Sequence, residues 1–198
     1  MALAADSNSR GRPKIEGLLA AIGALALLGA AWLALDAPTR LEIGRRLASA
    51  SGPAAAERAL VTAAIDGDTV LLADGRTVRL LGIDAPETVN PNLEHAQALG
   101  AAASERMHQL VDGQAVALEA DVTDADHYGR ILRHVWLGGQ LVGQTLVAEG
   151  LARAYALPPD LRHRDRLSDA EDRARRAGIG IWGLPRPTPL AIFAGPGE

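Results

Sequence analysis

Four short segments of the chain combine charged side chains with glycine or proline, the residues that make tight turns. They are Asp66-Gly67-Asp68, Arg79, the run Asp-Ala-Pro-Glu at 84–87 and the run Asp-His-Tyr-Gly-Arg at 126–130. Carboxylate oxygens are the ligands that hard cations such as calcium prefer, and a guanidinium can pair two phosphate oxygens at once. These residue types therefore suit a site that holds a divalent cation and a phosphate group.

The acidic turn Asp66-Gly67-Asp68 places two carboxylates two residues apart around a glycine. Glycine permits a tight bend, and such a bend can bring oxygen ligands to one point. The same three residues also fit a solvated hairpin in which aspartate is only a turn former. Taken alone, this turn leaves both interpretations open.

The run RLLGIDAPET at 79–88 places Arg79 in an expected strand, with Asp84 and Glu87 just beyond it in a turn fixed by Pro86. If Asp84 binds a cation, Glu87 can hold a water molecule beside it and act as a general base. Alternatively, the two carboxylates cap the following loop or helix and Arg79 is a surface cation. Arg130, taken alone, equally fits a plain turn that enters a strand.

The elements that must position these residues are mainly short strands. Alternating apolar and polar residues over 58–83 predict a three-stranded meander, with Asp74-Gly75 as a hairpin turn. A strand is expected at 114–120, and another at 130–137 that turns at Gly138-Gly139. The pattern therefore predicts five strands.

Three helices are predicted around these strands. The first covers 94–111, and its apolar stripe consists of Leu99, Ala103, Met107 and Leu110. A short helix at 141–149 ends at Gly150, and a longer one at 160–177 ends at Gly178. The stripe of the longer helix consists of Leu167, Ala170, Ala174 and Ala177. Five strands with a helix after the third predict an α+β fold that is mainly β, a five-stranded OB-fold barrel of Greek-key type over 57–184 with about three helices.

A membrane-directed segment is expected at the N-terminus. Residues 17–35 form 19 uncharged residues that follow a basic flank at 1–16. At about 1.5 Å per residue they span roughly 28 Å, which predicts a transmembrane anchor or uncleaved signal. The alternative is a buried helix of a soluble core, which a chain this short can hardly cover on every side. Basic residues on both sides leave the orientation open.

Residues 36–56 turn small and rich in Ser, Gly, Pro and Ala, as linkers do, after a stretch that can form a short juxtamembrane helix. A flexible tail is expected at 185–198.

Composition narrows the functional classes. The 198 residues include no cysteine, which excludes disulfides, thiolate zinc sites and cysteine nucleophiles. Residues 57–198 carry 14 basic and 20 acidic side chains, so this part of the chain can bind a polyanion only with the help of a bound cation or a local arginine cluster. The five histidines lack metal-ligand spacing and are interpreted as surface or structural residues; they are His95, His108, His127, His134 and His163.

Taken together and in this order, the motifs closely resemble those of the thermonuclease family, the staphylococcal nuclease-like calcium-dependent nucleases. The landmarks are IDGDTV at 65–70, RLLGIDAPET at 79–88, DHYGR at 126–130, EGLA at 149–152 and GIW at 180–182. The resemblance covers about 57–182 and implies the same five-stranded barrel.

The resemblance implies a Ca²⁺ site and names its ligands. They would be the carboxylates of Asp68 and Asp84 and the main-chain carbonyl of Ala85, with Asp66 in the second shell. Ala85 stands where the best-known member has a hydroxyl residue, which matters little if only the carbonyl is used. The substrate groove of that member carries tyrosines, of which this chain offers Tyr155 and, in the earlier motif, Tyr128.

By the same resemblance, Glu87 would activate the attacking water, and the catalytic Arg79 and Arg130 would grip the phosphate and stabilise its transition-state charge. The expected function is a calcium-dependent endonuclease that hydrolyses DNA or RNA as a monomer. The alternative is a non-catalytic OB-fold module that binds nucleic acid or protein. Calcium is scarce in the cytosol, so we expect an extracytoplasmic domain that is membrane-anchored, or secreted if the N-terminal segment is cleaved.

Overall fold

The computed structural model describes residues 34–49, 51–86 and 94–184. Helix α2 (Ala37–Ser49) lies within the segment 36–56 that the sequence marks as a linker with a short helix. Among the described residues, no helix combines the length and the apolar character needed to cross a membrane. Nearly all of the predicted anchor at 17–35, and the whole tail at 185–198, lie outside the described residues.

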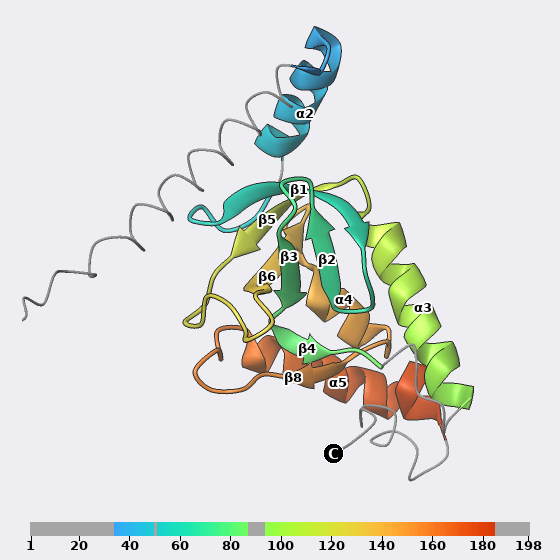
Figure 1. Cartoon of the computed structure of the whole chain (residues 1–198). Coiled ribbons are helices and arrows are strands. Elements are labelled where there is room, and N and C mark those ends of the chain that lie inside the picture. Colours follow the sequence, from blue (N-terminus) through green and yellow to red (C-terminus); the bar gives the residue numbers. More distant parts are fainter. Residues whose placement is uncertain (1–33, 50, 87–93, 185–198) are drawn as a thin grey trace, which may run out of the picture. The chain divides into compact units, whose positions relative to one another are not determined.

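Five strands close into the predicted barrel (Figure 1). They are β1 (Glu57–Ala64), β2 (Thr69–Leu72), β3 (Thr77–Leu80), β5 (Ala115–Glu119) and β6 (Ile131–Leu137). The sheet runs in the order β3-β2-β1-β5-β6 and continues to the short strand β7 (Gln140–Leu141). A parallel pairing of β3 with β6 joins the two sides and closes the barrel.

Alternation along the strands fills the barrel interior with β-branched and other aliphatic side chains. Val61, Val70, Val78 and Val116 are fully buried, and Leu118 is 2% exposed. Burial of aliphatic side chains contributes about 25 cal/mol per Å² of apolar surface, so this face holds the barrel together. The observed hairpin between β2 and β3 confirms the predicted meander.

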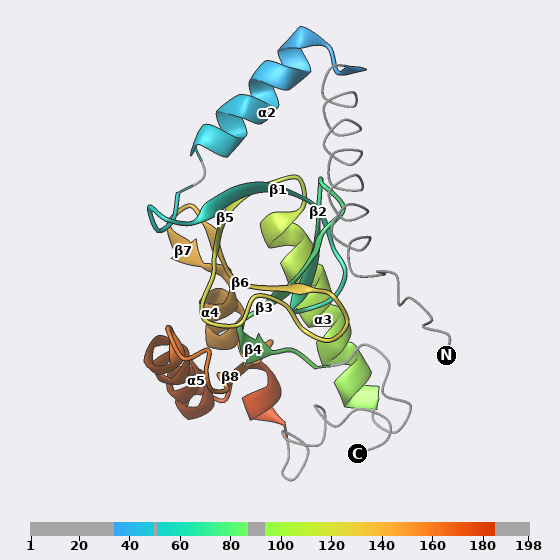
Figure 2. The same cartoon turned by 60° about the vertical axis from the view of Figure 1, so that its left-hand side comes forward.

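Helix α3 (Glu94–Val111) packs against β1. Figure 1 shows the helix beside the barrel, and in the turned view of Figure 2 it lies behind the barrel strands. Ala103 and Met107 of its predicted stripe are fully buried. Helix α4 (Val142–Ala148) covers β6 and packs against α5 (Arg164–Ala177), which a 3-10 turn (Gly180–Gly183) follows.

The predicted start and the last apolar position of the longer helix were both wrong. The helix begins at Arg164 rather than at 160, because the Asp160 carboxylate accepts the N–H groups of Val122 and Thr123 at 2.9 and 2.8 Å and so belongs to a loop. Its stripe ends at Ala174, and Ala177 is exposed in the last turn.

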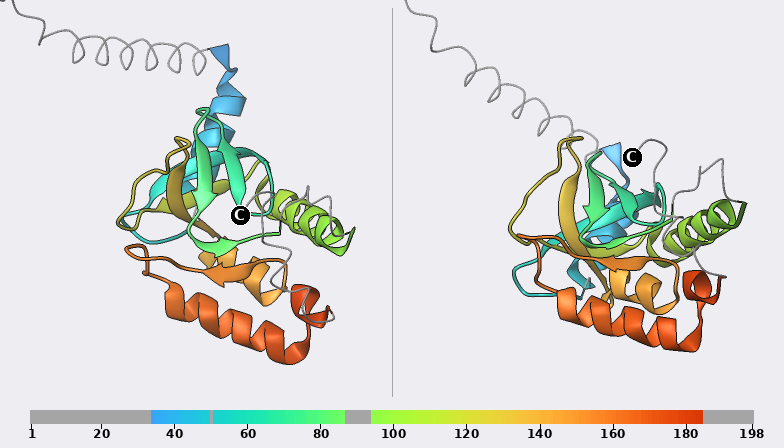
Figure 3. Two further views of the ribbon diagram at one scale, coloured as in Figure 1. Left: turned by 60° about the horizontal axis from the view of Figure 1, so that its bottom comes forward. Right: turned by 90° about the horizontal axis from the view of Figure 1, so that it is seen from below.

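A second, two-stranded sheet lies between the barrel and α5 (Figure 3). It pairs β4 (Gly82–Asp84) with β8 (Arg153–Tyr155), in a register that sets Asp84 opposite Arg153. The third predicted strand is therefore split, because Gly82 adopts a φ of 79° and turns the chain out of the barrel. This region of backbone space is readily accessible only to glycine.

Candidate active site

The acidic turn joins β1 to β2 at one end of the barrel. The N–H of Asp68 donates a hydrogen bond of 2.9 Å to Oδ1 of Asp66, so the turn is closed by its own side chain. Gly67 is required by close packing, since a Cβ atom there would lie 2.6 Å from the Cβ of Ala85 and 2.8 Å from that of Ala103. The glycine thus allows the turn to pack closely against Ala85, the residue that follows Asp84.

Asp68 is an acidic side chain inside the protein, with only 7% of the residue exposed. Its Oδ2 accepts the N–H of Ala85 at 2.9 Å, and its Oδ1 accepts the hydroxyl of Thr69 at 3.1 Å. Burial raises the pKa of Asp68 to about 7; the Arg79 guanidinium opposes this rise, and the neighbouring carboxylates add to it. The carboxylate therefore lies where an additional positive charge would be stabilising.

Arg79 bridges two of the predicted cation ligands. Its Nε lies 3.0 Å from Oδ1 of Asp68, and its Nη2 donates to Oδ1 of Asp84 at 3.2 Å. Its Nη1 donates to the carbonyl oxygens of Leu80 and Ile83 at 2.7 and 2.9 Å. Arg79 is therefore anchored to the backbone of β3 and β4 as well as to the acidic cluster.

Arg130 is held more loosely, at the start of β6. Its Nε donates to Oδ2 of Asp126 at 2.7 Å, while Oδ1 of Asp126 accepts the N–H groups of Tyr128 and Arg130. Burial acts to raise the pKa of Asp126, but the hydrogen bonds from Arg130 and Tyr128 outweigh it and lower this pKa below its ordinary value. The two terminal nitrogens of Arg130 make no hydrogen bond to any part of the chain that the structure describes.

A groove of about 470 Å³ brings the two arginines together. Arg79 and Arg130 both line it, because the parallel pairing of β3 with β6 sets Arg79 opposite Leu132, two residues past Arg130. Its wall also includes His127, Tyr155 and Leu157. Two guanidinium groups and an exposed aromatic ring in one groove suit a ligand that carries phosphate and a flat ring.

The predicted calcium ligands fit a hard cation by their chemistry. Asp68 and Asp84 contact the same guanidinium, and both offer carboxylate oxygens of the kind calcium prefers. In residues 34–49, 51–86 and 94–184, however, no group of three or more histidine or acidic side chains has the geometry of a ready metal site. Arg79 lies between the two carboxylates in this structure.

Among the described residues, two further charged side chains contact the predicted site residues, and neither was predicted as part of the site. Asp126 holds Arg130, and Arg153 contacts Asp84 at 2.8 Å across the β4–β8 sheet. The DHYGR motif itself signals Asp126, whereas Arg153 has no local signal, because its strand is only three residues long. Glu87, the predicted general base, lies outside the described residues.

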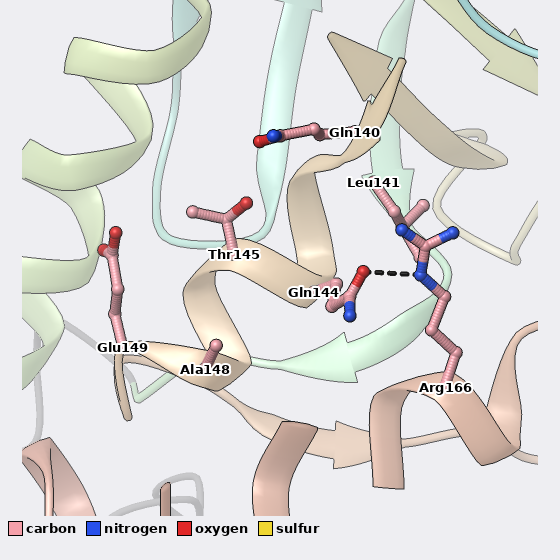
Figure 4. Close-up of a pocket in the computed structure, with 7 residues that line it drawn as sticks. All are labelled: Gln140, Leu141, Gln144, Thr145, Ala148, Glu149 and Arg166. Carbon is pink, nitrogen blue, oxygen red and sulfur yellow. Dashed lines mark hydrogen bonds between the residues drawn. The ribbon is translucent and has the colours of Figure 1, made fainter. Parts of the chain in front are cut away.

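A second hollow, of about 350 Å³, lies elsewhere, between α4 and α5. Figure 4 shows its lining, in which Arg166 donates to the amide oxygen of Gln144. None of the predicted site residues lines it. The groove with Arg79 and Arg130 therefore remains the candidate active site.

Away from the groove, a buried polar cluster joins β5, β6 and the loop before α5. The Glu119 carboxylate accepts the indole N–H of Trp136 at 2.9 Å and lies 2.7 Å from Nε2 of His163. The ring of His134 is 1% exposed, and its Nε2 lies 3.7 Å from Oδ2 of Asp121. Burial lowers the pKa of His134 to about 4, helped by His163 and opposed by the two carboxylates.

Comparison with known proteins gives consistent matches over this domain. Residues 77–183 match the family model described as "Staphylococcal nuclease homologue". The chain is 42% identical over 129 residues to a thermonuclease of Staphylococcus intermedius, and the matched segment covers 64% of this chain and 76% of that protein. It is 39% identical over 121 residues to a thermonuclease of Staphylococcus hyicus, covering 60% and 71%. It is 41% identical over 124 residues to endonuclease YncB of Bacillus subtilis, covering 60% and 58%.

Proposed function

The chain belongs to the staphylococcal nuclease homologue family and is a nuclease that hydrolyses phosphodiester bonds, and we propose that it cleaves DNA or RNA internally with calcium as its cation. One observation supports this proposal above the others. Arg79 contacts both Asp68 and Asp84 and lines the same groove as Arg130, so acidic ligands and phosphate-binding cations are adjacent.

The two arginines would bind the scissile phosphate. A pentavalent phosphorane-like state carries more negative charge than the diester, so positive groups that contact it stabilise the transition state preferentially. Arg130 is suited to this role because its contact with Asp126 uses Nε, and in the described part of the chain its terminal nitrogens make no hydrogen bond that would compete with a phosphate. Asp126 fixes the guanidinium without neutralising it fully, since the same carboxylate also serves two backbone N–H groups.

Asp68, Asp84 and the carbonyl of Ala85 would hold the calcium ion, with Asp66 supporting them through its bond to the backbone of Asp68. When bound, the ion would supply positive charge beside the phosphate and polarise it. Glu87 follows Asp84 by three residues, and we assign it the role of general base.

Aromatic side chains in and beside the groove would contact the bases. Tyr155 lines the groove and is 44% exposed. Tyr128 lies outside the lining and is 74% exposed, and its ring centroid lies 5.4 Å from Cζ of Arg130, which does line the groove. Stacking on a ring requires an unpaired base, so this groove favours single-stranded substrates over duplexes. Leu157, which is also exposed, offers an apolar contact rather than a second stacking ring.

The proposal includes a membrane tether at residues 17–35 and an extracytoplasmic location for the nuclease domain, in which calcium would be plentiful. The charge pattern and apolar length of that segment support the tether. A domain tethered there as a monomer would act on nucleic acid outside the cytosol.

A cleavage assay tests the proposal directly. The full-length chain in mild detergent is incubated with end-labelled single-stranded DNA, in calcium or in excess chelator, beside Glu87→Gln. We expect cleavage only with calcium, and a loss of about 10²–10⁴-fold in the variant. Glu105→Gln is the matched control, because Glu105 is an exposed carboxylate on α3, and it should cleave as the parent does.

Two outcomes would contradict the proposal. Undiminished cleavage in chelator would refute the calcium requirement. DNA that is bound but left intact under every condition, by protein shown to be folded, would favour a non-catalytic binding module.

A further inference from the structure

Asp84 is held from two sides by arginines on different strands. Its Oδ1 accepts Nη2 of Arg79 at 3.2 Å, while Nε and Nη2 of Arg153 lie 3.0 and 2.8 Å from its Oδ2. The contact with Arg153 follows from the β4–β8 register, which sets the two residues directly opposite each other. Both carboxylate oxygens of this predicted ligand are therefore paired with a guanidinium.

The other face of Arg153 contacts the groove wall. Its Cζ lies 4.7 Å from the ring centroid of Tyr155, two residues further along the same strand. Tyr155 lines the groove, whereas Arg153 is not one of the lining residues and has 23% of its side chain exposed. One guanidinium thus links the acidic cluster to the aromatic ring of the groove.

The charges alternate along this connection. Asp68 contacts Arg79, Arg79 contacts Asp84, and Asp84 contacts Arg153. A cation that binds Asp84 must share this carboxylate with two positive groups already within hydrogen-bond distance. Like charges a few ångströms apart repel strongly where water is partly excluded, so each arginine lowers the affinity of the cluster for a divalent ion.

We propose that Arg153 is a positioning residue that sets the calcium affinity of the active site and orients Tyr155 in the groove. This inference rests on the proposed function, because calcium is the cation assumed there. Arg79 shares the task of holding Asp84, so loss of Arg153 leaves the ligand in place and removes one opposing charge. Partners of metal ligands usually strengthen binding by raising ligand basicity, whereas a cationic partner acts in the opposite direction.

Calcium titration calorimetry on the full-length protein in detergent tests the proposal with a readout that does not depend on turnover. Arg153→Met keeps an unbranched aliphatic stem and removes the charge, and we expect it to bind calcium about tenfold more tightly, or more, than the parent. Arg153→Lys keeps the charge and should restore the affinity to within about threefold of the parent. Arg164→Met is the matched control, because Arg164 is an exposed arginine at the start of α5.

Kinetics at saturating calcium test the second half of the proposal. Because Tyr155 loses its contact with the guanidinium, Arg153→Met should raise the KM for single-stranded DNA severalfold while kcat changes less. An unchanged calcium affinity in Arg153→Met, beside a parent that binds calcium, overturns the inference alone. The absence of calcium binding by every variant overturns both the inference and the proposed metal. Circular dichroism and thermal melts establish that each variant is folded.

Discussion

Replacing each groove arginine by methionine separates a structural role from a catalytic one. Arg79 is 18% exposed in its side chain, bonds to two backbone carbonyls and pairs with the buried Asp68. Arg130 is 31% exposed in its side chain, and its partner Asp126 keeps two backbone N–H donors when the guanidinium is removed. We therefore expect Arg79→Met and Arg130→Met to be similar in activity and different in stability.

The expected magnitudes follow from burial. Removing one partner of a buried ion pair costs about 3–5 kcal/mol, because the remaining charge is left uncompensated. The Arg130–Asp126 pair, with 31% and 15% of its side chains exposed, is more accessible to water than the Arg79–Asp68 pair. A pair that water screens contributes about 1 kcal/mol or less. Each variant also loses one guanidinium that contacts the phosphate, which should lower kcat by about 10²–10³-fold.

Urea unfolding in chelator, followed by tryptophan fluorescence, measures the stability of each variant. Cleavage of single-stranded DNA in calcium, at a temperature below the melting temperature of the less stable variant, measures kcat. Equal stability losses in the two variants would refute the argument that Arg79 is a buried bridge. Parental activity in Arg130→Met would refute the role of Arg130 at the phosphate.

Three further outcomes are expected. The pKa of His134 is about 4 in the folded protein against an ordinary value of 6.5, so as the pH falls the imidazole becomes protonated in the unfolded chain before it does so in the folded one. The contribution of His134 to stability should therefore fall by up to about 3 kcal/mol as the pH falls from 6.5 to 4. His134→Gln should lose that part of the pH dependence in urea unfolding, and identical pH profiles of variant and parent would contradict the role of His134. The comparison with the parent is needed because the raised pKa of Asp68 changes stability with pH in the opposite direction. Gly67→Ala should destabilise the protein by about 1–3 kcal/mol and weaken calcium binding, because the new Cβ overlaps Ala85 and Ala103; calorimetry and thermal melts check both, and an unaffected variant would show that the turn can relax. Calcium at about 100 times its Kd should raise the free energy of unfolding by about 2.7 kcal/mol in the parent and by much less in Asp84→Asn, as thermal melts would show.

Much of the barrel was predictable from the sequence because its signals are local. Alternation along β1 to β3, the Asp74-Gly75 turn and the apolar stripe of α3 each arise from neighbouring residues that must share one buried face. The motifs at 65–70, 79–88 and 126–130 are equally local, and their order indicated the family that the comparisons establish.

The predicted groove arginines lie together because the barrel closes, which sequence spacing alone does not determine. Arg79 lies in β3 and Arg130 directly precedes β6, and these two strands pair in parallel only after the chain has passed through α3 and β5. The resemblance to the thermonuclease family therefore predicted that the two arginines share one site, which the periodicity of the sequence could not predict.

The strand and helix pattern and the chemistry of the acidic and basic motifs follow from the sequence alone, because they arise from residues close together in the chain. The membrane anchor at residues 17–35 stays a prediction. The pairing of the charges, in contrast, follows from the tertiary structure. Asp84 and Arg153 are 69 positions apart and meet through strands of three residues, too short to show any period. Such a contact depends on the pairing of β4 with β8 and on the packing of α5 against both strands. Packing of this kind is a property of the whole fold rather than of any one segment.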